Sequence, residues 1–427
     1  MSSAKIHRTN LMKLGFICGI FLMMGTLYAR AATDSIEKLA EDPACARGLA
    51  WIDKSSSWLT DQQIRLTEIP APEMNEAQRA EYFKKLLVSL GMNVRTDQTG
   101  NVIAERPGAD LNRVILLAAH LDTVFPAGTD VKVKRNSTRL AAPGIADNGA
   151  GLAALAGLAR ALSESRIQTA NTIVIAGDVG EEGEGNLRGI RALVEEYEPR
   201  LAAVIAVDGA STEHITTQGI ASHRLEITIN GPGGHSWSDF GAPNPITAIS
   251  RGIVKFSALP IPDQPRSSYN FAVIAGGTSV NSIPSRAIVK VDLRSEDEAQ
   301  VDKMERALRD AMQSAAKEEM AASRSNEPLE VNFRSLGSRP AGKLADSAPL
   351  LETLRNVDRF LGNRSRLERS STDANIPLSL GIPAISLGGG GKGGGSHTLK
   401  EWYDSTGREL GLKRLYLATV ALAGIQR

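Results

Sequence analysis

The chain has 427 residues, more than one typical domain, and 42% of them are hydrophobic while 23% are charged. This composition is that of a soluble globular protein, and it excludes an intrinsically disordered or membrane-embedded chain. The formal net charge is +1 and no dense run of Lys and Arg is present, so we expect neither nucleic acid nor acidic lipid as a partner.

Residues 1–31 have the pattern of a signal peptide. Lys5, Arg8 and Lys13 precede an apolar run over residues 14–27, and residues 29–31 follow it with the small-x-small pattern of a cleavage site. The run is short for a membrane span. We therefore expect an exported protein, periplasmic or secreted, with no stable membrane insertion once the leader is removed. The alternative is an uncleaved N-terminal anchor.

Residues 32–218 alternate between helical patterns and apolar runs typical of strands. Alternation of this kind predicts an α/β catalytic domain whose central sheet is mostly parallel and covered on both faces. The expected elements are helix 75–90, strand 114–118, helix 149–162, strand 172–176, helix 189–197 and strand 202–207. Polar residues follow each strand, and ligands of open α/β sheets bind beyond the carboxyl ends of the strands.

Residues 219–336 change the order of elements. The expected sequence is strand 225–229, helix 245–258, strands 269–274 and 287–293, helix 298–322 and strand 329–333. This β-α-β-β-α-β order predicts an inserted ferredoxin-like unit. The α/β domain then resumes over 337–427 with helix 348–360, strand 384–387 and helix 408–425. The glycine-rich stretch 388–395 lacks phosphate-loop spacing, so we expect a loop with close backbone approach.

The first chemical motif is His120-Leu121-Asp122 at the end of a predicted strand. Residues two apart on a strand face the same way, so the Asp122 carboxylate can lie beside the His120 imidazole. A carboxylate in that place fixes the tautomer of a metal-binding histidine and raises its basicity. The simpler interpretation is a hydrogen-bonded pair without a metal.

Two further motifs supply carboxylates. Asp147 and Asn148 precede the glycines of a predicted helix, where they can cap the helix or let Asp147 bridge two metals. Glu181 and Glu182 are adjacent after a buried strand, where like charges are costly unless cations offset them. In the functional interpretation, one of this pair ligates a metal and the other acts as general base. The alternative is a solvated acidic loop.

Asp208, after the strand predicted at 202–207, and His397, in Ser396-His397-Thr398, complete the set. The chain has only six His, so two of them beside this group of strand-end acids are informative. Two imidazoles with three carboxylates suit two divalent ions, zinc first and manganese or cobalt as alternatives, rather than calcium.

In this order, the motifs His-x-Asp, Asp-Asn-Gly-Ala-Gly, Glu-Glu-Gly, Asp-Gly, Gly-Gly-His-Ser and Ser-His-Thr resemble the M20 family of metallopeptidases. The nearest resemblance is to peptidase T-like tripeptidases and related dipeptidases. It covers essentially the whole mature chain. It implies a zinc-peptidase-like catalytic domain with an inserted lid and dimerisation domain. It also implies site roles: the metal ligands are His120, Asp147, Glu182, Asp208 and His397, with Glu181 as base and Asp122 beside His120.

The same resemblance assigns roles within the inserted unit. His235 would reach the active site of a partner subunit and stabilise the oxyanion, which implies a homodimer. Asn281 and Arg294 would hold the polar ends of the substrate, and residues 371–374 resemble a loop near it. The aspartate at position 208 favours aminopeptidase-like specificity, because relatives with glutamate there tend to be carboxypeptidases or deacylases.

The sequence therefore predicts a two-metal hydrolase that cleaves amide bonds of small peptides, as an aminopeptidase-like di- or tripeptidase. Within the same architecture, the alternative is an N-acyl-amino-acid deacylase, a desuccinylase or a carboxypeptidase. A non-catalytic binding protein is a more remote alternative. Such proteins usually lose ligands or the base, whereas all six residues are present in this chain.

Overall fold

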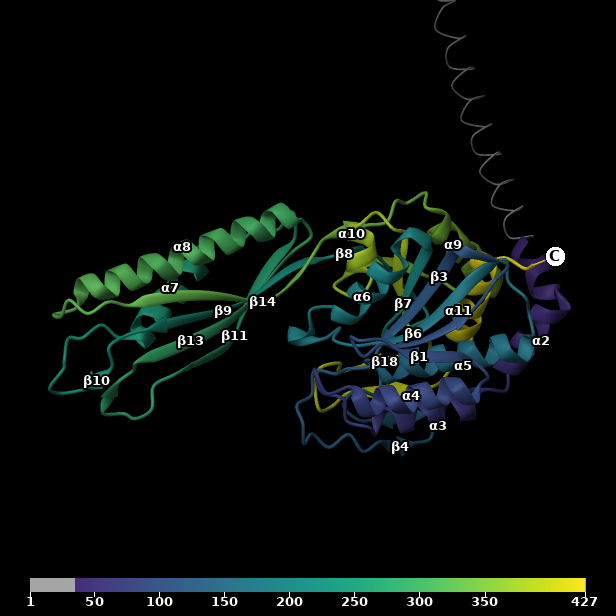
Figure 1. The fold of residues 1–427 in the computed structure, drawn as a ribbon, viewed down its shortest axis with the longest axis horizontal. Helices are drawn as coiled ribbons and strands as arrows, with labels where there is room; N and C mark the ends of the chain where they lie inside the picture. Colours follow the sequence, from purple (N-terminus) through teal and green to yellow (C-terminus); the bar gives the residue numbers. More distant parts are fainter. Residues whose placement is uncertain (1–34, 427) are drawn as a thin grey trace, which may run out of the picture.

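The computed structural model describes residues 35–426. These residues form two parts that lie side by side in Figure 1, one built on a nine-stranded sheet and the other on a four-stranded sheet. The predicted signal peptide lies outside the described residues, so it stays a prediction. Among residues 35–426, no helix has the length and apolar character needed to cross a membrane.

The nine-stranded sheet has parallel strands at its centre and mostly antiparallel pairs toward its edges. Its strands are β1 (Asn93–Thr96), β2 (Val102–Arg106), β3 (Asp110–His120), β6 (Asn171–Asp178), β7 (Leu201–Val207), β8 (His214–Gly219), β15 (Gly342–Lys343), β16 (Arg366–Ser370) and β17 (Ala384–Leu387). β6, β3, β7 and β17 are neighbours and run parallel. β1, β2, β8 and β15 add antiparallel pairs, whereas β16 pairs in parallel with β8. The predicted α/β fold with a central, mostly parallel sheet is confirmed.

The central strands form because their sequences are continuous apolar runs. In β3, residues 114–119 are all buried, and successive side chains point to opposite faces, so both faces of the sheet are covered. Burying each Val, Leu or Ile side chain of such a strand contributes about 1.5–3 kcal/mol. This burial places the carboxyl end of β3, which carries His120, at the edge of a rigid core.

Some of the helices begin at polar residues that satisfy free backbone N–H groups. The helices are α2 (Pro43–Ile52), α3 (Ser56–Thr67), α4 (Ala77–Ser89), α5 (Gly149–Ser165), α6 (Arg188–Tyr197), α7 (Pro245–Ser257), α8 (Glu298–Ala322), α9 (Pro349–Leu361), α10 (Asn375–Ser379) and α11 (Arg408–Ala423). The side chains of Asn148, Asn244 and Asp297 accept hydrogen bonds from the first turns of α5, α7 and α8. α5, α6 and α11 pack against β3 and cover the sheet.

The four-stranded sheet is antiparallel, with the order β11-β13-β9-β14. Its strands are β9 (Ala221–Asn230), β11 (Ser267–Gly276), β13 (Arg286–Ser295) and β14 (Glu330–Arg339), and a short ladder joins β10 (Gly234–His235) to β12 (Ser282–Ile283). α7 and α8 pack against this sheet and enclose a separate apolar core. The elements follow the β-α-β-β-α-β order expected for residues 219–336. The domain boundaries at 31, 218 and 336, and the role of this part as a lid, stay predictions.

A third sheet includes part of the glycine-rich stretch 388–395. It consists of β4 (Lys134–Asn136), β5 (Arg139–Ala141), β18 (Lys392–Gly394) and β19 (Trp402–Asp404). A Cβ atom on Gly389 would lie 2.7 Å from the Ala150 carbonyl oxygen, and one on Gly390 would lie 2.6 Å from the Arg408 carbonyl oxygen. The close backbone approach expected of this stretch is therefore present, although β18 within it was not predicted.

Candidate active site

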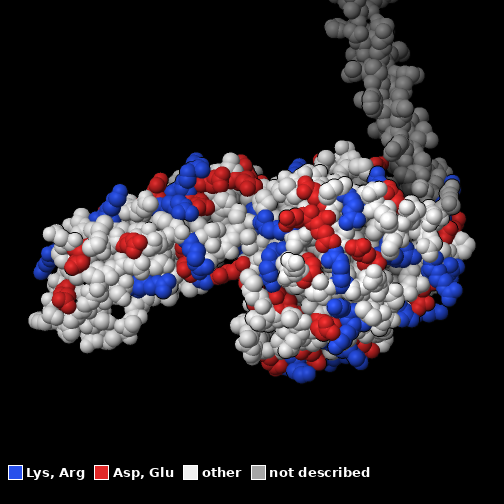
Figure 2. Space-filling model, viewed as in Figure 1, with Lys and Arg blue, Asp and Glu red and all other residues white. Residues whose placement is uncertain are grey.

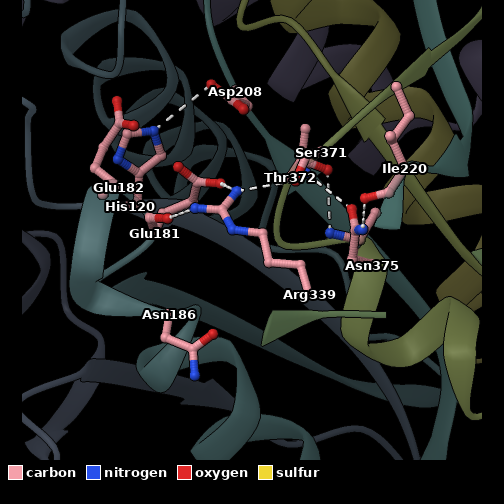
Figure 3. Close-up of polar contacts among 12 residues, drawn as sticks. His120, Glu181, Glu182, Asn186, Asp208, Ile220, Arg339, Ser371, Thr372 and Asn375 are labelled. Atoms are coloured by element: carbon pink, nitrogen blue, oxygen red, sulfur yellow. Dashed lines mark hydrogen bonds and ion pairs between the residues drawn. The ribbon is translucent and has the colours of Figure 1, made fainter. Parts of the chain in front are cut away.

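The predicted metal ligands meet at the carboxyl edge of the large sheet. His120 is the last residue of β3, Glu182 follows β6 and Asp208 follows β7. Asp147 comes from the turn that precedes α5, and His397 comes from the loop between β18 and β19. Figure 3 shows His120, Glu182 and Asp208 converging from their separate strands. Parallel strands end at one edge of a sheet, so the fold gathers these residues from distant parts of the sequence.

Asp147 lies between two pairs of ligands. One carboxylate oxygen, Oδ1, is 3.2 Å from His120 Nε2, and the other, Oδ2, is 3.3 Å from His397 Nε2. His120 Nε2 is also 3.6 Å from Asp208 Oδ1, and His397 Nε2 is 3.0 Å from Glu182 Oε1. The ligand atoms of each group lie within 4.8 Å of one another. Two groups that share one carboxylate could hold two metal ions, with Asp147 common to both groups.

The donor atoms of this site fit divalent cations. His120 is 1% exposed, and its Nε2 atom is buried without a hydrogen-bond partner among the described residues. Burial by itself lowers the pKa of His120, but Asp122, Asp147 and Asp208 raise it well above its ordinary value. Burial likewise opposes ionisation of Asp147, yet His120 and His397 hold its pKa far below its usual range. The surroundings therefore favour positive charge, and imidazole nitrogen with carboxylate oxygen suits zinc, manganese or cobalt.

The second ligand pair shows the same excess of negative charge. Burial raises the pKa of Glu182 to about 7, against the effect of its hydrogen bond to His397. Hydrogen bonds to Asp147 and Glu182 raise the pKa of His397 to about 10. The two carboxylates thus hold a positive charge beside them, which is the environment that a bound cation requires.

Asp122 has a different main contact from the one predicted. Its carboxylate is 3.7 Å from His120 Nδ1, and the closer contact of that nitrogen, at 3.1 Å, is the backbone oxygen of Asp122. The carboxylate instead accepts the backbone N–H groups of Glu181 at 3.0 Å and Glu182 at 2.8 Å. The reason is that β3 ends at His120, so Asp122 turns toward the loop after β6. Asp122 therefore fixes the loop that carries the predicted base and a predicted ligand.

Glu181, the predicted general base, is paired with an arginine. Arg339, the last residue of β14, donates from Nη1 to Glu181 Oε1 at 2.8 Å and to Ser371 Oγ at 3.1 Å, and its Nη2 donates to the Glu181 backbone oxygen. Figure 3 shows the guanidinium reaching between Glu181 and Ser371. Burial raises the pKa of Glu181, and Arg339 opposes that rise. The sequence analysis missed Arg339, because no local motif marks an arginine whose partner lies 158 residues away.

Asn148 links two of the ligand-bearing loops. Its Nδ2 donates to the Val207 backbone oxygen at 2.8 Å, and its Oδ1 accepts the N–H of Gly209 at 3.2 Å, so it contacts both neighbours of Asp208. The same Oδ1 accepts the N–H of Gly151 and caps α5. The capping interpretation of this turn and the metal-site interpretation are therefore both compatible with the structure.

Comparison with known proteins decides the family. The model of peptidase family M20/M25/M40 matches residues 116–420, which is well over half of the chain. The chain belongs to this family. It is 24% identical over 332 residues to a putative succinyl-diaminopimelate desuccinylase from Mycobacterium tuberculosis, covering 76% of this chain and 88% of that protein.

Two solved structures share its fold. A tripeptidase from Staphylococcus aureus has a TM-score of 0.69 at 20% identity, covering 86% of this chain and 98% of that one. A dinuclear metal binding peptidase of the M20 family from Bacillus subtilis has a TM-score of 0.62 at 16% identity, covering 87% and 99%. The expected resemblance to the M20 family is confirmed, and this M20 chain is a hydrolase.

The structure does not place the three remaining predicted residues, His235, Asn281 and Arg294, beside the predicted metal ligands of their own chain. His235, the last residue of β10, and Asn281, just before β12, are neighbours, because Ser236 N donates to the Asn281 backbone oxygen at 3.0 Å. Figure 1 places β10 at the end of the smaller part that is far from β3 and β6. Arg294 lies near the opposite end of that sheet, half-buried, with its Nε 2.7 Å from Asp292 Oδ2. These three assignments stay predictions.

Two buried carboxyl groups near the site interact with each other, and the sequence analysis did not predict this interaction. Asp178, at the end of β6, and Asp373, in the loop 371–374 noted in the sequence, are almost fully buried. Both Asp178 oxygens and Asp373 Oδ1 are without a hydrogen-bond partner among the described residues. Burial raises the pKa of Asp178 to about 7 and that of Asp373 well above its usual range. The charge of Asp178 adds to the rise in the pKa of Asp373, whereas the side-chain interaction with Asp373 lowers the pKa of Asp178. The pKa of each carboxyl is therefore higher in the folded protein than that of an exposed aspartate.

This pair predicts a pH dependence of stability. A carboxyl whose pKa is raised on folding binds more protons in the folded state, so the free energy of unfolding falls as the pH rises from about 4 toward 7. Replacing Asp373 with Asn removes one charge and should reduce this fall. Thermal unfolding of chelator-treated protein between pH 5 and pH 8 would measure the effect, with the exposed Asp346→Asn as control. An unchanged pH dependence in Asp373→Asn would contradict the prediction.

Proposed function

We propose that this M20 hydrolase is a two-metal, aminopeptidase-like peptidase that cleaves di- and tripeptides, with Glu181 as general base. The observation that carries the proposal is the position of Asp147 between the pair His120 and Asp208 and the pair His397 and Glu182. His120 and Asp208 would hold one ion, His397 and Glu182 the other, and Asp147 both. Zinc is the proposed metal, with manganese or cobalt as alternatives.

The proposed roles follow from the chemistry of amide hydrolysis. When bound, the two ions would activate a water molecule and polarise the scissile carbonyl. Glu181 would take the proton of that water and later deliver it to the leaving amine. Arg339 and the backbone contacts of Asp122 support this role, because they hold the Glu181 carboxylate and main chain in a fixed place beside His120 and Glu182. A fixed base requires little reorganisation during the reaction.

The role of Glu181 predicts a separation of activity from metal binding. Glu181→Ala should abolish measurable turnover while the protein keeps about two metal ions per chain, because the five ligands remain. Steady-state kinetics with metal analysis would test this. Glu184→Ala, an exposed residue of the same loop, is the matched control and should retain activity. Substantial residual activity in Glu181→Ala would remove Glu181 as the base.

Substrate preference separates the two candidate functions of this site. Asp208 supports cleavage next to a free amino terminus, whereas the relative described as a putative desuccinylase supports the alternative deacylase function. We expect leader-free protein, reconstituted with zinc, manganese or cobalt, to hydrolyse unblocked di- and tripeptides faster than N-acyl-amino acids. Measured kcat/KM values on such a panel decide between them, and a clear preference for N-acyl substrates would favour the deacylase.

We further propose a homodimer in which each copy supplies His235 to the other. The His235 ring accepts the N–H groups of Trp237 and Ser238 on Nδ1, at 3.1 and 3.4 Å, so its exposed Nε2 is left as a hydrogen-bond donor for an oxyanion. Trp237, Val280 and Ile274 are exposed around it. Figure 2 shows few charges at this end of the molecule, and large exposed apolar areas commonly mark interfaces.

A mixing experiment tests this arrangement. His235→Ala should lower kcat by about 100- to 1,000-fold, the usual effect of losing one oxyanion donor. Mixing and reassociating His235→Ala with Glu181→Ala should restore about a quarter of wild-type activity, since half of randomly formed dimers would be mixed and each would hold one complete site of two. Light scattering would report the dimer. A mixture no more active than its components, or a fully active monomer, would contradict the proposal.

We also propose that the enzyme is exported from the cytoplasm. Residues 1–31 carry the charged start, apolar run and cleavage-type end of a signal peptide, which supports a periplasmic or secreted enzyme.

A further inference from the structure

Glu401, four residues after His397, is a buried carboxylate that no motif in the sequence singled out. It is 1% exposed, and its two oxygens accept three backbone N–H groups from the loop that carries Asp147. Oε2 accepts Gly144 N at 2.9 Å, and Oε1 accepts Ala146 N and Asp147 N, each at 2.8 Å. A buried carboxylate that accepts several N–H groups forms strong, charge-assisted hydrogen bonds.

The loop before α5 depends on these contacts for its shape. It lies outside helices and strands, so its peptide groups need other partners. Glu401 takes three of its N–H groups, and Gln63 Nε2 donates to the Ile145 oxygen at 2.7 Å. Gln63 is in turn held by Arg408, whose Nη2 donates to Gln63 Oε1 at 2.7 Å. The backbone that presents Asp147 is thus fixed by side chains on both sides.

A carboxylate that binds loop N–H groups is not unusual by itself. Asp97 accepts the N–H groups of Thr99, Gly100 and Asn101, but all of these belong to its own turn. Glu401 instead contacts the N–H of Asp147 across 254 residues of sequence, from the segment that also carries His397. It therefore links the backbone of Asp147, the shared ligand of the site, to the segment that carries His397.

Asp122 makes the equivalent contact on the other side of the site. It follows His120 by two residues and accepts the N–H groups of Glu181 and Glu182. Each histidine of the site is thus followed by a buried carboxylate that fixes the backbone of a loop bearing carboxylate ligands. The two arrangements differ in that the loop held by Glu401 carries Asp147, the residue common to both ligand groups.

We propose that Glu401 is a positioning residue that sets the affinity of the site for both metal ions by fixing the backbone of Asp147. The inference rests on the proposed two-metal function, because Asp147 matters to both ions only as a bridge. In Glu401→Gln the shape is kept, but the amide group offers N–H where an oxygen accepted N–H, so at least one contact is lost. In Glu401→Asp the charge is kept but the side chain is too short to preserve all three contacts.

Direct metal titration tests the proposal. Zinc or manganese alone is added to chelator-treated protein, and both dissociation constants are measured by calorimetry or by competition with a metal indicator. Loss of residues that orient metal ligands typically costs 10- to 100-fold in affinity, and we expect an increase of about that size in both constants for Glu401→Gln and Glu401→Asp. Asp358→Asn is the matched control, since Asp358 on α9 is a buried carboxylate paired with Arg414 on α11.

The control separates positioning from general stabilisation. Asp358→Asn should lower the melting temperature and leave both dissociation constants unchanged. A folded Glu401→Gln with wild-type constants, or with only a lower melting temperature, overturns the proposal. If Glu401→Gln fails to fold, wild-type constants in Glu401→Asp overturn it equally. Wild-type protein that binds no metal would overturn the proposed function together with this inference, a result distinct from normal affinity in the variants alone.

Discussion

The site depends on holding carboxylates together at the edge of the large sheet although their charges repel. Ligand atoms within each group lie no more than 4.8 Å apart. At that separation two like charges repel by about 3.5 kcal/mol with an effective dielectric constant near 20. Such an arrangement persists only where the fold supplies positive partners. Here these are the two histidines, Arg339 beside Glu181, and backbone N–H groups directed at Asp122 and Glu401.

Backbone N–H groups suit this purpose because they add partial positive charge without adding a flexible side chain. Asp122 and Glu401 are nearly inaccessible to solvent, so each hydrogen bond that they accept is expensive to lose. The loops after β6 and before α5 are consequently held in one arrangement. Because the ligands are already ordered, little of the free energy of cation binding is needed to order them.

The sequence was informative wherever a local pattern determines the structure. The helix expected at 298–322 has those bounds in α8, and the strand ends at His120 and Asp208 followed from continuous apolar runs. The ligands could be grouped because parallel strands end at one edge. Arg339 and the pairing of Asp178 with Asp373 could not be predicted, since contacts across long sequence separations leave no periodic signal. β8 escaped prediction because its Thr-rich sequence lacks an apolar run.

The contact of Arg339 with Glu181 also connects the two parts of the molecule. Arg339 ends β14, Arg224 of β9 donates to the Gly183 backbone oxygen, and Lys290 of β13 lies 2.5 Å from Glu184. Three strands of the smaller sheet thus contact the loop that begins at Glu181. Of these contacts, that of Arg339 with Glu181 is buried, and buried charge-assisted hydrogen bonds are stronger than exposed ion pairs such as that of Lys290. Any displacement of the smaller sheet therefore changes the surroundings of Glu181. The reason is that Arg339, whose guanidinium binds Glu181, belongs to β14 and would move with that sheet.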